Sequence, residues 1–124
     1  MVYRGDENLS GTMVCAILVV VGMLAAGQVL FKYASRMLDF SRPATFLSVP
    51  LLSALLLYAL ATICWLLVLS RVPLTLAFPF YGLGFVVVPL LSWIFLKEAL
   101  TLPVIIGSSI IAVGVVIVAM GARA

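Results

Sequence analysis

The sequence predicts an all-α membrane protein with four transmembrane helices in an antiparallel bundle, acting as a dimer. Of the 124 residues, 66% are hydrophobic and only 9% are charged, which is unlike the composition of a soluble domain. The apolar residues fall into four long runs, and at about 1.5 Å per residue each run can cross a hydrocarbon core of about 30 Å. Because the connections between the runs are short, successive helices must run in opposite directions.

We expect the helices at residues 13–35, 48–69, 73–96 and 102–121, which together form a single transmembrane domain of residues 13–121. Residues 1–12 precede it as a polar tail. Pro50 and Pro103 fall in the first turns of the second and fourth helices, where the missing N–H costs little. Four cationic residues (Lys32, Arg36, Arg42 and Lys97) fall at one end of this bundle, against three (Arg4, Arg71 and Arg123) at the other. By the positive-inside rule, this count favours both termini outside the cytoplasm.

The residue content argues against several classes of function. The chain has no histidine, the commonest metal ligand, and Cys15 and Cys64 both lie in expected spans, where they are typical of small buried apolar residues. We therefore expect no metal site and no cofactor. The formal charge of +3 comes from scattered residues with no basic run, so nucleic-acid binding has no support. The connections are too short to hold a soluble catalytic domain, and we expect no enzyme.

The third helix is the most unusual segment. Pro79 and Pro89 each remove a helix hydrogen bond and free an upstream carbonyl, which in a membrane must face protein or water. Gly82 and Gly84 would permit close approach by another backbone or a ligand. Tyr81 lies beside the glycines. The sequence therefore predicts a kinked helix inside the bundle, with Pro79, Tyr81, Gly82 and Gly84 as candidate substrate-binding residues.

The end of the first helix carries Gln28, Lys32 and Arg36 at intervals of four, so they share one helical face. One interpretation is that the cations extend to the interface and anchor the helix. The other is a ladder of donors that receives an anionic headgroup. The anchor is favoured for Arg36, whereas both interpretations remain open for Lys32. Gln28 and Lys32 are accordingly candidate substrate-binding residues.

Three further features have two interpretations each. Tyr58 and Trp65 are seven residues apart and share a face, which favours packing over a ligand cage. Glu98 lies in a connection beside Lys97, which favours an interfacial ion pair or a helix cap over a proton carrier. Gly107, Gly114 and Gly121 form a heptad-spaced stripe on the fourth helix, suited either to packing within the chain or to a dimer seam.

Three segments resemble the drug/metabolite transporter superfamily: AGQVLFKYAS (26–35), WLLVLSRVPLTLAFPFYGLGFVVVPLLS (65–92) and EALTLPVIIGSSIIAVGVVIVA (98–119). Within it, the chain is most similar to the short EamA-like group that includes the subunits of the 4-amino-4-deoxy-L-arabinose-phosphoundecaprenol flippase. The AGQ-x-x-x-K-x-A and V-P-x-x-x-A-[YF]-P elements are fairly specific to that group. The glycine-rich fourth helix is generic across the superfamily.

The resemblance implies a multi-pass protein of the bacterial inner membrane that moves a polyprenyl-phosphate-linked sugar, as a homodimer or paired with a similar four-helix subunit. Small multidrug resistance proteins are near relatives, but they rely on a carboxylate in the middle of the first helix. The corresponding residues 19–26, VVVGMLAA, contain no ionisable group, which argues against proton-coupled drug export. A small multidrug or metabolite exporter and a non-transporting membrane partner remain the alternatives.

Overall fold

The computed structural model of the protein describes residues 10–121, which are helical apart from short connections. The helices are α1 (Gly11–Ser35), α2 (Val49–Leu69), α3 (Leu74–Tyr81), α4 (Gly84–Leu91) and α5 (Leu102–Gly121). A short 3-10 helix, η1 (Pro43–Leu47), precedes α2, and a π-helical turn, η2 (Ser92–Leu96), follows α4. Four segments are long and apolar enough to cross a membrane: α1, α2, Leu74–Leu96 and α5. The predicted all-α fold with four spans is therefore confirmed.

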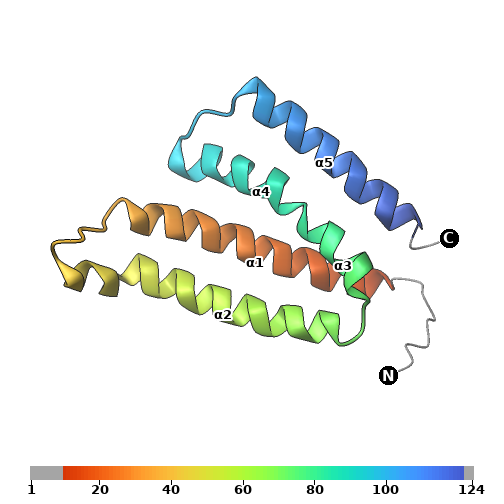
Figure 1. The fold of residues 1–124 in the computed structure, drawn as a ribbon, viewed down its shortest axis with the longest axis horizontal. Coiled ribbons are helices and arrows are strands. Elements are labelled where there is room, and N and C mark those ends of the chain that lie inside the picture. The colour runs from red at the N-terminus through yellow and green to blue at the C-terminus, as the bar shows by residue number, and fades with distance from the viewer. Residues whose placement is uncertain (1–9, 122–124) are drawn as a thin grey trace.

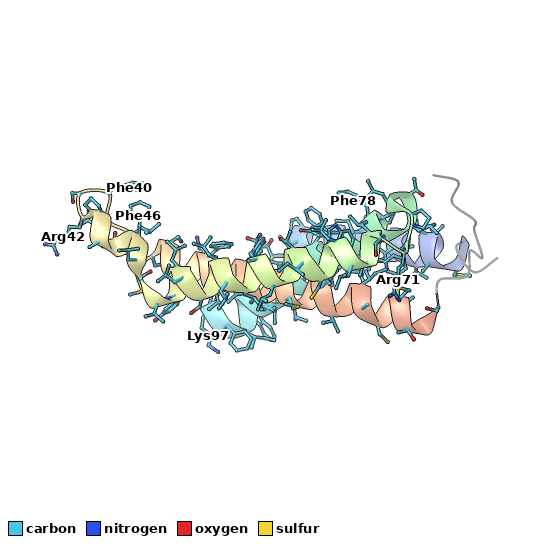
Figure 2. All side chains as sticks on the ribbon, turned by 90° about the horizontal axis from the view of Figure 1, so that it is seen from below. Phe40, Arg42, Phe46, Arg71, Phe78 and Lys97 are labelled. Atoms are coloured by element: carbon cyan, nitrogen blue, oxygen red, sulfur yellow. The ribbon has the colours of Figure 1, made fainter. Side chains whose placement is uncertain are left out.

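The spans alternate in direction along the chain (Figure 1). α1 packs most extensively on α2 and also contacts α4, while α5 packs on α3 and α4 at the edge of the bundle. The turn at residues 70–73 lies at the end of the bundle where α1 begins and α5 ends, which we call the terminal end. The connections 36–48 and 97–101 lie at the opposite end, the loop end. Arg71 marks the terminal end, and Phe40, Arg42 and Phe46 mark the loop end (Figure 2).

α1 begins two residues earlier than expected. The Ser10 hydroxyl accepts a hydrogen bond of 3.3 Å from the Met13 N–H and so caps the first turn. Gly11 and Thr12, expected in the polar tail, are therefore helical. The remaining part of that tail, residues 1–9, lies outside the described residues.

The third span is interrupted rather than only kinked. The N–H of Gly82 donates to the Pro79 carbonyl and that of Leu83 to the Phe80 carbonyl, both at 3.0 Å and both with three-residue spacing. This tighter turn separates α3 from α4. A Cβ atom at Gly82 would lie 2.9 Å from the Pro79 oxygen, so the turn needs a residue without a side chain.

The best-packed part of the chain lies towards the terminal end. Its main cluster of buried residues comes from α1, the end of α2 with the turn that follows it, α3 and α5, and a smaller one comes from α1 and α2. The main cluster consists of Ile17, Val21, Val68, Val72, Ala77, Phe80 and Val115. The smaller cluster consists of Val20, Leu24 and Ala61. Val115 is the one buried residue of α5, so most of that helix faces outward.

The cysteines differ from expectation in one respect. Both are free, and Cys64 is half-buried, but Cys15 is exposed, so the expectation that it is buried is wrong. Cys15 lies near Leu18 and Val19, which are also exposed. This face of α1 is therefore covered by no other described part of the chain.

Candidate functional site

A cavity of about 310 Å³ lies between α1, α2 and the third span. Its wall is largely apolar, with polar side chains at three positions. The lining residues are Val21, Leu24, Ala25, Gln28, Tyr58, Tyr81, Gly84, Phe85, Val88 and Pro89. A site of this composition suits a ligand with much apolar surface and few polar groups.

The structure brings together only some of the candidate residues. Gln28, Tyr81 and Gly84 line the cavity, and a Cβ atom at Gly84 would meet nothing within 4 Å, so this glycine leaves the cavity open. Gly82 does not line it, since its missing side chain faces Ile111 and Val115 on α5. Pro79 does not line it either, and its carbonyl accepts the Gly82 N–H.

Tyr58 is a lining residue that sequence reasoning assigned to packing alone. Its hydroxyl accepts a hydrogen bond from the side-chain amide of Gln28, which joins α2 to α1 inside the cavity. Its ring lies so close to Gly27 that a Cβ atom there would be 2.6 Å from two ring carbons. A signal was present in the sequence, because a glutamine within a span needs a hydrogen-bonding partner.

Aromatic contacts hold Tyr81 in the cavity wall. Its ring stacks on that of Phe78, with centroids 5.8 Å apart and planes inclined by 7°. The ring of Trp65, from α2, meets it edge-on with centroids 5.4 Å apart. Trp65 also packs against both buried clusters, so the packing interpretation is correct for this residue.

Pro89 shapes the cavity wall through the hydrogen bond that it cannot make. Without an N–H, Pro89 leaves the carbonyl of Phe85 with no partner in its own helix. The Ser108 hydroxyl of α5 donates to this oxygen at 2.7 Å. The expectation that a freed carbonyl must face protein is thus confirmed here, and α5 supplies the donor.

The cations of α1 meet a carboxylate at the loop end. Nη2 of Arg36 lies 3.5 Å and Nζ of Lys32 lies 4.0 Å from the same oxygen, Oε1 of Glu98. The predicted ion pair of Glu98 is therefore confirmed, but its partners come from α1 rather than from the adjacent Lys97. Lys97 adopts a left-handed backbone conformation (φ 57°), and Figure 2 shows it at an edge of the bundle.

Asp39 organises the connection from α1 to α2. Hydrogen bonds from the Ser41 side chain and backbone N–H hold the pKa of Asp39 below its usual value. Arg42 pairs with the same side chain, its Nε lying 3.9 Å from Oδ2. This carboxylate thus has local partners of its own.

Among residues 10–121, no three histidine, cysteine or acidic side chains gather as a metal site would require.

The glycine stripe of α5 faces open space. A Cβ atom at Gly107, Gly114 or Gly121 would meet nothing within 4 Å. These glycines therefore do not mark a close contact between helices of this chain. Of the two interpretations of the stripe, packing within the chain has no support in these contacts.

Residues 4–120 match the EamA-like transporter family. The chain belongs to that family. Its relatives include a probable 4-amino-4-deoxy-L-arabinose-phosphoundecaprenol flippase subunit, ArnF, of Erwinia tasmaniensis, which is 41% identical over 78 residues. That match covers 55% of this chain and 61% of the relative, so the chain spans less than two thirds of its length.

A second relative of this EamA-like chain is matched over the whole of the relative's length. The probable flippase subunit ArnE of Salmonella paratyphi C, named for the same lipid-linked sugar, is 32% identical over 111 residues. That match covers 89% of this chain and 100% of the relative. No solved structure gives a significant match. The resemblance to the short EamA-like group is therefore confirmed.

Proposed function

We propose that this chain is a subunit of a flippase that moves a polyprenyl-phosphate-linked sugar across the bacterial inner membrane. Support comes from its EamA-like family and from two relatives whose names give this activity. The substrate's lipid tail stays in the bilayer during such a movement. The protein therefore needs to shelter only the polar headgroup and the first part of the tail.

The combination of residue types along α1 is the observation that carries this proposal. Val21, Leu24 and Ala25 contribute apolar cavity wall, Gln28 adds an amide, and the cations Lys32 and Arg36 follow towards the loop end. From residue 21 to residue 36 the helix rises by about 22 Å. A polyprenyl-phosphate-linked sugar offers a matching group for each of these: an apolar chain, sugar hydroxyl groups, and the phosphate that joins them.

We assign the candidate residues to parts of this ligand. Lys32 binds the phosphate, while Gln28, Tyr58 and Tyr81 offer hydrogen bonds to hydroxyl groups. Gly84 leaves room for the ligand. In this proposal Pro79 and Gly82 act indirectly, because they form the turn that lets α4 diverge from α3 and expose the cavity.

The functional unit is proposed to be a dimer, either of two copies or with a similar four-helix subunit. A helix with one buried residue and an open glycine stripe offers a surface on which another helix can pack closely. The ArnE and ArnF relatives are themselves named as subunits. We assign this role to the face of α5 that contains Gly107, Gly114 and Gly121.

The residues of the spans favour this lipid over a multidrug export substrate. Within residues 10–121, both carboxylates, Asp39 and Glu98, lie in connections between helices. Proton-coupled exchange of a cationic drug requires a titratable group inside the membrane. The cavity, whose polar groups are an amide and two phenols, has no carboxylate to bind a proton and a cationic drug in turn.

Transport in proteoliposomes tests the proposal. The protein is reconstituted with any subunit that co-purifies from its own membrane. Undecaprenyl phosphate carrying an aminosugar is added, and its amine is labelled from outside by a membrane-impermeant reagent. We expect the lipid to exchange between leaflets faster than in empty liposomes. Relative to the parent protein, exchange should be slower with Lys32→Gln and unchanged with Lys97→Gln.

Lipid exchange no faster than in empty liposomes would contradict a transport role and favour a non-transporting partner. Exchange of quaternary cations instead would favour a drug exporter.

A further inference from the structure

We infer that Lys32 and Arg36 form a binding site for a phosphate ester, and that Glu98 occupies this site in the free chain as an exchangeable counter-ion. The phosphate of the ligand and the Glu98 carboxylate then compete for the same two cations. This inference rests on the proposed function and adds an internal competitor to it. It also gives Arg36 a role beyond the anchor that its sequence position favours.

The geometry of the three side chains is that of an anion between two cations. Lys32 and Arg36 are one helical turn apart on α1, and Glu98 reaches them from 62 residues further along the chain than Arg36. One oxygen, Oε1, makes both contacts, at 3.5 Å to Arg36 and 4.0 Å to Lys32.

A phosphate ester fits this position better than the carboxylate does. It offers at least two non-bridging oxygens, so each cation can have its own acceptor instead of sharing one. The planar guanidinium of Arg36 presents several N–H groups in an arrangement that matches phosphate oxygens. Because the carboxylate leaves as the phosphate enters, the two cations are not left without a negative partner.

The existing ion pairs are easy to exchange. The side chains of Lys32, Arg36 and Glu98 are 54%, 50% and 40% exposed, so water and ions reach all three. Exposed ion pairs of this length contribute little net stability, since solvent screens them and the long side chains lose freedom. A ligand that is also held by the apolar cavity can therefore displace Glu98.

Displacement has a structural consequence. Glu98 belongs to the connection between η2 and α5, where its N–H donates to the Ser92 carbonyl at 3.3 Å. Its ion pairs link that connection to α1. Exchange with a phosphate removes this link, so the loop end of α1 is free to separate from the start of α5 when the ligand is bound.

The test uses a substitution that should strengthen binding. The chain is placed in phosphatidylcholine nanodiscs, and binding of farnesyl phosphate is measured by titration. Glu98→Gln keeps the shape of the side chain but removes the competing charge, so we expect binding about three- to fivefold tighter. The matched control is Asp39→Asn, which removes the other carboxylate of the loop end and should leave the affinity unchanged.

Further arms identify the ligand chemistry. Lys32→Gln or Arg36→Gln should weaken farnesyl phosphate binding, and either change should abolish the gain caused by Glu98→Gln. Farnesol should bind more weakly than its phosphate and should not respond to Glu98→Gln. If inorganic phosphate shows the same gain as farnesyl phosphate, the site exists but receives free phosphate.

The outcomes separate this inference from the proposed function. If the parent binds farnesyl phosphate and Glu98→Gln leaves that affinity unchanged or weaker, the counter-ion inference is wrong and the flippase proposal stands. If Glu98→Gln gives the expected gain but the parent transports no lipid, the phosphate site is real and the flippase proposal fails. A parent that binds neither farnesyl phosphate nor inorganic phosphate overturns the inference directly.

Discussion

The Ser108 hydroxyl donates a hydrogen bond of 2.7 Å to the carbonyl oxygen of Phe85, on a different helix. Phe85 lies four residues before Pro89, so its oxygen is the one that the proline leaves without a partner. The bond therefore connects α5 to the cavity-lining helix α4 at the point where α4 lacks an internal hydrogen bond. It explains how a proline in this apolar span is accommodated.

Ser108→Ala should destabilise the protein by about 1–3 kcal/mol, because the Phe85 oxygen loses its donor in a surrounding with little water. Unfolding in mixed detergent micelles measures this loss. The control is Ser109→Ala, whose hydroxyl bonds to Ile105 on its own helix and leaves no interhelical gap. In a Pro89→Ala background, which restores an N–H, Ser108→Ala should cost less. Equal losses in both backgrounds would contradict this explanation.

Gly27→Ala should disturb the cavity, since the new Cβ atom would lie 2.6 Å from ring carbons of Tyr58. The ring must move, and the Gln28–Tyr58 hydrogen bond should break. Overpacking of this kind costs about 1–3 kcal/mol, more than the roughly 1 kcal/mol that alanine gains over glycine in a helix. Gly22→Ala, where a Cβ atom meets nothing within 4 Å, is the matched control and should be neutral or stabilising. Detergent unfolding of both variants checks this, and equal stability would contradict the tight contact.

Gly107→Leu and Gly114→Leu should shift the detergent-solubilised protein towards monomer. A Cβ atom at either position would meet nothing within 4 Å, so the fold of the chain should be kept. The control is Val116→Leu, nine residues after Gly107 and therefore half a turn round the helix. Mass measurement and crosslinking report the association. An unchanged dimer in both glycine variants would remove this face from the interface.

Tyr58→Phe should weaken binding of a polyprenyl-phosphate-linked sugar by about fivefold, the equivalent of about one hydrogen bond to a sugar hydroxyl. The ring remains, so the contact with Gly27 and the tilted packing on Phe31 are kept. Thermal unfolding should change much less than binding. An unaltered affinity would mean that the Gln28–Tyr58 pair serves packing only.

The spans themselves follow from the sequence because hydrocarbon thickness sets the length of an apolar helix. A disturbance of the third span was also foreseeable from its prolines, but it was expected as a kink and is an interruption. Its location was not foreseeable, because the turn at Gly82 depends on the three-residue hydrogen bonds and on the side chains of α5 beside it. Prolines and glycines in the sequence indicate that a helix will be disturbed, while tertiary packing determines the position of the disturbance.

The site was only partly visible in the sequence for a related reason. Gln28 stood out as a polar residue in an apolar span, but its partner Tyr58 depends on which face of α2 turns towards α1. The seven-residue spacing places Tyr58 and Trp65 on one face of α2, but it does not show which helix that face contacts. The pairing of Glu98 with Arg36 likewise depends on tertiary structure, because the connection before α5, which contains Glu98, lies beside the end of α1.

Photocrosslinking of a polyprenyl phosphate with a diazirine near its phosphate end tests most directly whether the cavity beside α1 receives this lipid. In membranes containing the protein, we predict crosslinks to Ala25, Gln28, Phe85 or Val88 around the cavity, which excess undecaprenyl phosphate should suppress. Lys32→Gln should lower their yield, and Lys97→Gln should not. Crosslinks confined to outward residues of α5, such as Val116 and Ile117, would contradict the account, because the lipid would then touch only the outside of the bundle.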